Sequence, residues 1–265
     1  MPRYENVRNV LLDIEGTICP ISFVKETLFP YALRALPAVL TTKWDDRDFI
    51  PYRDAFPPSH RSSPQALQAH VEDLTKRDIK IAYLKNLQGY LWEEGYRSGS
   101  YATPLFPDVV PRLKLWRERG VRLGVYSSGS VAAQRLLFGY VASADGEDDG
   151  LDGRAGQGER PAGKEDFRYL IVEKGWFDTT NAGLKTEVES YVKIVQTLDW
   201  KAEQTLFLTD NILEYDAATA AGLQALLVIR PGNATLSDTE KARLVGRTVY
   251  GLGQIGIVVS GEHGQ

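Results

Sequence analysis

After Thr103, short apolar stretches alternate with stretches of helical periodicity, and this alternation limits the possible folds more than any other feature of the chain. The predicted strands are VRLGVYSSG from Val121, QTLFLTD from Gln204, LQALLVIR from Leu223 and a last one near Val249. The predicted helices lie among them, at 108–120, 130–139, 187–198 and 212–222. Strands that alternate with helices form a parallel sheet with helices on both faces, so we expect an α/β fold.

A helix-rich segment separates the first predicted strand from all the others. The first strand, 6–13, is apolar and ends at a Gly turn, whereas the pattern is helical from Ser22 to about Gly99. A block of helices placed between two strands of one sheet is best explained as an insertion. We therefore expect a core made of 1–20 and 101–265, with a small helical domain, 21–100, inserted into it.

Three places have the residue pattern of a helix N-terminus. Ser63 precedes Pro64, which is an N-cap residue followed by proline at the first helical position. In a capping box, a Ser or Thr and a Glu three residues later each accept the other's backbone N–H. Such boxes are predicted at Thr186–Glu189 and at Ser237–Glu240.

Composition and charge are those of an ordinary globular protein. Of the 265 residues, 43% are hydrophobic and 25% are charged. The net charge of −4 argues against a dedicated nucleic-acid-binding protein, which normally carries a basic surplus. A mildly acidic protein can still bind phosphorylated metabolites, because such sites consist of a few local groups.

The cysteine content and the N-terminus bear on the compartment. With a single cysteine no intramolecular disulfide can form, which favours a reducing compartment. The N-terminal segment has no basic leader followed by a long apolar stretch, and Val10–Leu12 is far shorter than a membrane span. We expect a cytoplasmic monomer with no membrane partner, and entry into the nucleus by diffusion stays open.

The segment 143–166, SADGEDDGLDGRAGQGERPAGKED, is rich in glycine and acidic residues and almost free of large apolar side chains. Such a segment cannot bury enough surface to offset its ordering entropy. We expect a flexible surface loop, with a functional acidic segment as the alternative.

Polar side chains that can carry chemistry lie near the carboxyl ends of the predicted strands, where open α/β sheets bind ligands. Each of them has an ordinary explanation as a cap, a turn residue or a solvated side chain, but their joint occurrence favours one shared site. In chain order they are Asp13 and Glu15 after the first strand, Ser127 and Ser128 after the second, Lys185 before a helix, and Asp210 after the strand LFLT.

The chemistry of these groups fits a phosphoryl-transfer site. Asp13 and Glu15 are two residues apart and would repel each other when ionised, unless a cation lies between them or one is protonated. Mg²⁺ prefers oxygen ligands and usually takes few from protein, and Asp13 and Asp210 can supply them. The Ser127 hydroxyl and the N–H groups of the next turn can bind an anion, and Lys185 adds positive charge. A carboxylate nucleophile, a metal site and an anion site together indicate phosphoryl transfer.

Five blocks of the chain carry a family resemblance: LLDIEGTICPISFVKETLFPYA, VYSSGS, GLKTEVESYVKI, FLTDNILEYDAA and VIRPGNA. They resemble the motifs of the haloacid dehalogenase superfamily and, more closely, those of the enolase-phosphatases (acireductone synthases) of methionine salvage. The superfamily usually has Asp where this chain has Glu15, and the enolase-phosphatases resemble this chain in having Glu. The resemblance covers most of the chain but is weak in the middle of the helical insertion and absent from the Gly-rich segment.

The resemblance implies a fold, a cofactor and a reaction. The fold would be a Rossmann-like haloacid dehalogenase core with a parallel sheet and an inserted helical cap domain. The enzyme would depend on Mg²⁺ and act on a small phosphorylated diketone, 2,3-diketo-5-methylthiopentyl-1-phosphate. It would enolise this substrate and then remove the phosphate, which gives the acireductone 1,2-dihydroxy-3-keto-5-methylthiopentene.

The resemblance also implies residue roles. Asp13 would be the nucleophile, forming an aspartyl-phosphate, and a metal ligand as well. Glu15 would bind the metal through its main-chain carbonyl, and a further hypothesis gives its side chain the activation of water. The remaining implied roles are binding of the substrate phosphate by Ser127 and Ser128, substrate binding and charge stabilisation by Lys185, metal binding by Asp210, and support of the metal site by Glu214.

Three functions are alternatives to that of an enolase-phosphatase. The chain could be another phosphatase of the superfamily with a different small phosphate ester, which would give no enol absorbance change. It could be a dehalogenase, which uses an aspartate nucleophile without metal, but Asp210 and Lys185 argue against this. A non-catalytic binding protein on the same fold would have no need to keep both carboxylates.

Several other residues have two interpretations. Cys19 is interpreted as a small buried apolar residue rather than a nucleophile, because no basic group marks a lowered pKa. Phe23 and Tyr31 either cover the methylthio end of the substrate or belong to the core. No histidine is assigned as the enolisation base, because surface or cap roles are favoured for all three: His60, His70 and His263.

Overall fold

The computed structural model of the protein describes residues 3–79, 81–143 and 163–258. Most of the Gly-rich segment 143–166 and also His263 lie outside the described residues. By its internal contacts the chain divides into two compact units. Ser22–Ala102 forms the helical unit, and the described residues before Ser22 and after Ala102 form the sheet unit.

The sheet unit is built on six parallel strands in the order β6-β3-β2-β7-β8-β9. In this register Leu12 of β2 lies opposite both Val125 of β3 and Leu208 of β7, so the carboxyl ends of these strands meet at one edge. The predicted α/β fold with a parallel sheet is confirmed. The strands are β2 (Asn9–Leu12), β3 (Arg122–Tyr126), β6 (Trp176–Phe177), β7 (Thr205–Thr209), β8 (Gln224–Val228) and β9 (Thr248–Val249).

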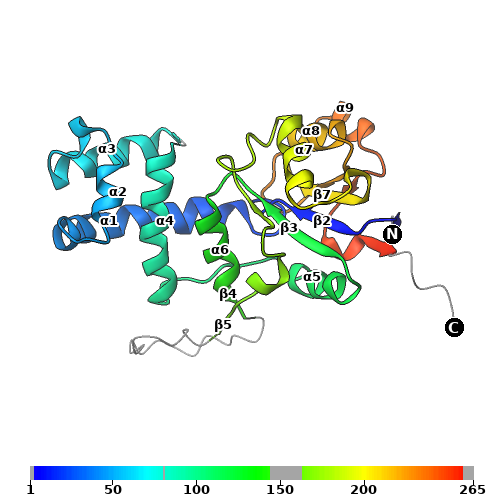
Figure 1. Cartoon of the computed structure of the whole chain (residues 1–265), viewed down its shortest axis with the longest axis horizontal. Helices are drawn as coiled ribbons and strands as arrows, with labels where there is room; N and C mark the ends of the chain where they lie inside the picture. The colour runs from blue at the N-terminus through cyan, green and yellow to red at the C-terminus, as the bar shows by residue number, and fades with distance from the viewer. Residues whose placement is uncertain (1–2, 80, 144–162, 259–265) are drawn as a thin grey trace. The chain divides into compact units, whose positions relative to one another are not determined.

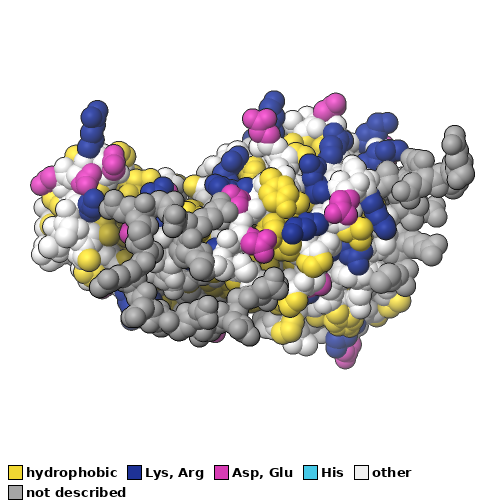
Figure 2. All heavy atoms as spheres, turned by 90° about the horizontal axis from the view of Figure 1, so that it is seen from below, with side chains coloured by type: hydrophobic (Ala, Val, Ile, Leu, Met, Phe, Trp, Pro, Cys, Tyr) yellow, Lys and Arg dark blue, Asp and Glu magenta, His cyan; other side chains and the backbone are white. Residues whose placement is uncertain are grey.

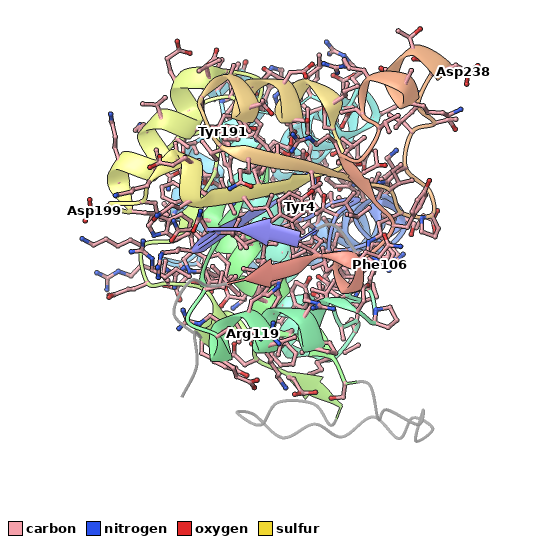
Figure 3. All side chains as sticks on the ribbon, turned by 90° about the vertical axis from the view of Figure 1, so that its right-hand side faces the viewer. Tyr4, Phe106, Arg119, Tyr191, Asp199 and Asp238 are labelled. Atoms are coloured by element: carbon pink, nitrogen blue, oxygen red, sulfur yellow. The ribbon has the colours of Figure 1, made fainter. Side chains whose placement is uncertain are left out.

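Helices cover both faces of this sheet (Figure 1). On one face α7 (Val188–Thr197) and α8 (Ile212–Ala220) pack their apolar side chains onto the strands. Figure 3 shows Tyr191 of α7 on this side of the sheet, and Arg119, which follows α5 (Val109–Glu118), on the other. The core of the first face consists mainly of Leu11, Tyr126, Tyr191, Ile194, Phe207 and Ala218.

Shorter elements complete the sheet unit. One further α-helix, α6 (Val131–Gly139), follows β3, and another, α9 (Asp238–Arg243), begins with the predicted capping box of Ser237 and Glu240. Two small two-stranded sheets are β1 (Arg3–Glu5) with β10 (Gly256–Val258), and β4 (Val141–Ala142) with β5 (Lys164–Glu165). Single 3₁₀ turns are η3 (Arg168–Leu170), η4 (Ala202–Gln204) and η5 (Leu252–Gln254).

The predicted capping box at Thr186 is wrong. Helix α7 has Glu187 at its N-cap position, with no side-chain hydrogen bond, and Thr186 is exposed. The reason is a turn just before the helix, closed by a hydrogen bond from the Glu187 N–H to the Leu184 carbonyl. This turn includes Lys185 and Thr186 and therefore moves the helix start by one residue.

The helical unit consists of helices packed around an apolar and aromatic interior. Ser63 caps α3 by accepting the Ala66 N–H at 3.1 Å, with Pro64 at the first helical position as predicted. The Trp92 indole donates to the Leu28 carbonyl at 2.7 Å and ties α4 to the N-terminal end of the unit. The helices are η1 (Phe23–Leu28, a π-helix), α1 (Phe29–Lys43), α2 (Ile50–Asp54), η2 (Pro58–His60), α3 (Pro64–Lys76) and α4 (Ala82–Arg97).

Within this unit the rings of His60 and His70 are stacked, with centroids 3.7 Å apart and planes 2° from parallel. His70 Nε2 lies 3.2 Å from the Tyr83 hydroxyl. Burial and the charge of His60, followed by that of Arg77, lower the pKa of His70, while Asp73 acts in the opposite direction. As the pH falls, His70 therefore takes up its proton at a higher pH in the unfolded chain than in the folded one.

We expect the free energy of unfolding to fall as the pH drops below about 6.5, because the contribution of His70 is fully present only above the unfolded pKa. An NMR titration of the His70 ring should give a pKa below that of a free histidine. In the His60→Gln variant the pKa of His70 should move upward. A pKa of His70 that is unchanged by this substitution would contradict the contribution of the His60 charge.

Among the described residues, no helix combines the length and the apolar character needed to cross a bilayer. On the face of the molecule shown in Figure 2, basic and acidic side chains both occur across the described surface.

Candidate active site

Asp13 lies directly after β2, in the middle of the sheet, and is 4% exposed. Its N–H donates to the Leu208 carbonyl at 2.9 Å, which extends the pairing of β2 with β7 by one residue. The chain then turns at Gly16, whose φ of +74° is the left-handed conformation that favours glycine. The strand therefore presents the Asp13 carboxylate at the edge where neighbouring strands also end.

Lys185 joins two buried carboxylates of this site. Its ammonium lies 2.5 Å from Asp13 Oδ1 and 2.7 Å from Glu214 Oε2, and its side chain is only 8% exposed. The Tyr191 hydroxyl donates to the Lys185 carbonyl at 2.6 Å and so holds the turn that carries this lysine. Burial opposes the positive charge, but Asp13 and Glu214 outweigh it, and the pKa of Lys185 is raised.

Asp210 and Glu214 bring two more carboxylates to the same place. Asp210 follows β7, and Glu214 lies in the first turn of α8, where its Oε2 accepts the Thr209 hydroxyl at 2.7 Å. Burial, together with repulsion from Asp13 and Glu214, raises the pKa of Asp210 to about 7. Burial and the charge of Asp13 also raise the pKa of Glu214 to about 7. Lys185 pairs with two of these carboxylates, and its charge partly offsets the repulsion at Asp210.

The donor set fits a hard dication. Gly16 lies so close to Asp210 that a Cβ at this position would overlap its carboxylate, which brings the turn after β2 against the end of β7. Among the described residues no three His, Cys, Asp or Glu side chains form a metal-binding group by themselves. Asp13 and Asp210 can nevertheless provide two carboxylates and Glu15 a main-chain carbonyl, which suits Mg²⁺ because it takes few protein ligands. A dication would also compensate the excess of negative charge.

Ser127 and Ser128 follow β3, next to the strand that presents Asp13. Ser127 is buried, and its Oγ accepts the Gly129 N–H at 3.1 Å. The Val131 N–H, at the start of α6, donates to Asp178 Oδ2 at 2.9 Å. The Gly129 N–H of the predicted anion-binding turn and the Val131 N–H at the helix start are therefore engaged within the protein, and an anion must compete with Ser127 and Asp178 for them.

The other predicted candidates are a buried cysteine of the sheet unit and two aromatic residues of the helical unit. Cys19 is fully buried, and burial together with the charge of Glu15 raises the pKa of its thiol, as expected for a structural cysteine. Phe23 and Tyr31 belong to the helical unit, where both pack edge-on against Tyr101.

Sequence reasoning missed the residues that support the site through hydrogen bonds. Gln134 is buried in α6 and donates to the Gly129 and Phe177 carbonyls, at 2.8 and 2.7 Å. Arg230 and Asn233 lie after β8 and donate to carbonyls of the turn after β2. The block VIRPGNA, which includes both, was the available signal, but nothing in it indicates a contact more than 200 residues away in the chain.

The comparison with known proteins decides the family. A family model described as haloacid dehalogenase-like hydrolase matches residues 7–222. The chain belongs to this family. The enolase-phosphatase E1 of Sclerotinia sclerotiorum is 50% identical to this haloacid dehalogenase-like hydrolase over 258 residues, 97% of each chain. That of Botryotinia fuckeliana is 52% identical over 240 residues, 89% of each chain. This hydrolase is thus an enzyme of the enolase-phosphatase E1 family.

Solved structures agree with the fold of this hydrolase. The UTR4 protein of Saccharomyces cerevisiae is 37% identical, with a TM-score of 0.74, 95% of this chain and 97% of that chain being covered. CbbY from Rhodobacter sphaeroides, crystallised with phosphate, is 17% identical with a TM-score of 0.52, over 95% and 97% of the two chains. The second likeness is one of fold alone. The predicted haloacid dehalogenase fold is confirmed.

Proposed function

We propose that this enzyme converts 2,3-diketo-5-methylthiopentyl-1-phosphate to the acireductone 1,2-dihydroxy-3-keto-5-methylthiopentene and phosphate, as a step of methionine salvage. The observation that carries the proposal is the buried group of Asp13, Lys185 and Glu214 at the carboxyl edge of the sheet, in a chain about half identical to proteins named enolase-phosphatase E1. A central strand that ends in a carboxylate paired with lysine suits covalent phosphoryl transfer.

In the phosphatase step, an oxygen of the Asp13 carboxylate attacks phosphorus, and the bond between phosphorus and the substrate's C1 oxygen breaks. Lys185 lies 2.5 Å from Asp13 and stabilises the negative charge that spreads over the phosphoryl oxygens. Ser127 and Ser128 bind the phosphate from the neighbouring strand. Water then hydrolyses the aspartyl-phosphate, which frees phosphate and restores Asp13, and we assign the activation of that water to Glu15.

In this proposal Asp13, Asp210 and the Glu15 carbonyl hold Mg²⁺, and Glu214 supports the site from α8. Bound Mg²⁺ would supply a Lewis acid for the diketone and phosphoryl oxygens. The enolisation moves a proton from C1 of the substrate to the oxygen of the C2 carbonyl, which gives the enol while the phosphate is still attached. Lys185 and the serines keep that phosphate in place during this step.

The helical unit Ser22–Ala102 follows the nucleophile turn in the sequence and precedes β3. We propose that it is the cap of the enzyme, and that aromatic side chains such as Phe23 and Tyr31 cover the methylthio end of the substrate. A folded Tyr31→Ala variant should then lose activity through a higher KM for the substrate.

One assay tests the proposed reaction. The diketo phosphate is supplied with Mg²⁺ or with EDTA, and enol absorbance is followed together with free phosphate. We expect both signals with Mg²⁺ and neither with EDTA, because the acidic site lacks its compensating charge without the metal. Phosphate release without any enol signal would instead favour a phosphatase for another small ester, and activity that resists EDTA would contradict the metal assignment.

A further inference from the structure

The loop after β8 holds two successive carbonyls of the turn that follows the nucleophile. Asn233 Nδ2 donates to the Gly16 carbonyl at 2.9 Å, and Arg230 Nε donates to the Thr17 carbonyl at 3.1 Å. These contacts join segments that are 217 and 213 residues apart in the chain. Neither side chain has a role in the reaction proposed above.

Both donors are themselves firmly held. Arg230 is 7% exposed, forms a two-pronged ion pair with Asp108 at 2.8 and 3.0 Å, and lies 4.3 Å from the centre of the Phe106 ring. Asn233 also donates to the Val228 carbonyl at 3.2 Å, at the end of β8. Because the two donor side chains are held in place, they can also hold the carbonyls that accept their hydrogen bonds.

The carbonyls that they hold lie next to a peptide group of the proposed metal site. The Gly16 N–H donates to the Cys19 carbonyl at 2.8 Å, and in a trans peptide the Glu15 carbonyl points the opposite way. Because Gly16 has no Cβ, its φ and ψ angles are less restricted than those of any other residue type. The hydrogen bond that the Gly16 N–H donates and the one that the Gly16 carbonyl accepts therefore determine where the Glu15 carbonyl points.

We propose that Asn233 and Arg230 are positioning residues, which fix the turn after β2 so that the Glu15 main-chain carbonyl completes the metal site of Asp13 and Asp210. This inference rests on the metal assignment in the proposed function. The Thr17 hydroxyl, 3.4 Å from Asp13 Oδ2, extends the same network to the nucleophile. The two donors would act on the metal site through the backbone, because their contacts to the turn are to its main-chain carbonyls.

The test measures metal affinity in the full-length enzyme without substrate, with Mn²⁺ as the probe and electron paramagnetic resonance as the readout. Asn233→Leu keeps roughly the size of the side chain and removes the donor to Gly16 without adding a charge beside Asp210, and Arg230→Lys removes the planar donor to Thr17. We expect each to weaken Mn²⁺ binding by about 10- to 100-fold, as is typical when the support of a metal ligand is lost. At saturating metal kcat should recover, because no reacting group has changed.

The matched control is Arg243→Lys, which alters an exposed arginine–aspartate pair with Asp216 and should leave Mn²⁺ affinity unchanged. Thermal unfolding of each variant separates loss of the metal site from loss of the fold. If Arg230→Lys does not fold, Asn233→Leu alone tests the inference. Unchanged Mn²⁺ affinity in a folded Asn233→Leu variant would overturn the inference. If the wild type itself did not bind Mn²⁺, or if Asp210→Asn bound it equally well, the metal assignment would fail instead.

Discussion

Replacing Asp13 by Asn is expected to reduce phosphate release by about 10⁴-fold or more, the loss typical of removing a covalent nucleophile. Asn keeps the size of the side chain but cannot displace the substrate oxygen from phosphorus to form an acyl phosphate. Asp13 is 4% exposed and lies directly after a central strand, where the Lys185 ammonium pairs with its carboxylate. The measurement is phosphate release from the diketo phosphate at saturating Mg²⁺.

Asp216→Asn is a suitable control for this substitution. Asp216 of α8 has a side chain that is 43% exposed and pairs with Arg243, and its loss should leave the rate unchanged. Circular dichroism should show that both variants fold. Turnover of Asp13→Asn within about tenfold of the wild type would rule out Asp13 as the phosphoryl acceptor.

Replacing Lys185 by Met is expected to lower the free energy of unfolding by about 3–5 kcal/mol, the usual effect of removing one partner from a buried ion pair. The substitution leaves Asp13 and Glu214 buried without the ammonium that lies 2.5 and 2.7 Å from them. The same change should abolish phosphate release, because the transferred group loses its nearest positive charge. Urea unfolding in EDTA measures the first effect without interference from bound metal.

The double variant Lys185→Met, Glu214→Gln tests the electrostatic origin of this loss. Removing one of the two unpaired carboxylates should restore part of the stability but none of the activity. If Lys185→Met were as stable as the wild type in EDTA, the ion pairs of Lys185 would not stabilise the fold.

The sequence predicted the elements whose pattern is local. Alternation of apolar and amphipathic stretches was sufficient for β3, β7, β8 and the helices among them, and Ser63 and Ser237 marked two helix starts correctly. The strand-end polar residues were also predictable, since parallel strands of one sheet end at the same edge. Asp13 meets Lys185, which lies in the turn before α7, although the two residues are 172 residues apart.

Features that depend on tertiary contacts were not predictable in this way. Strand β6 has only two residues, Trp176 and Phe177, which are too few for any period. The N-cap of α7 is Glu187 and not Thr186, because the preceding turn places Lys185 in the site. Here a tertiary contact outweighs the local sequence pattern. The hydrogen bonds of Arg230 and Asn233 join distant segments, and neither residue type indicates its partner.

The most direct test of the account is a crystal structure of the enzyme with Mg²⁺ and beryllofluoride, which mimics a phosphoryl group bound to a carboxylate. We predict beryllium attached to a carboxylate oxygen of Asp13, with Mg²⁺ in contact with Asp13, Asp210 and the Glu15 carbonyl. Beryllofluoride bound at another side chain, or Mg²⁺ bound away from both aspartates, would contradict the central claim that Asp13 accepts a phosphoryl group at a magnesium site.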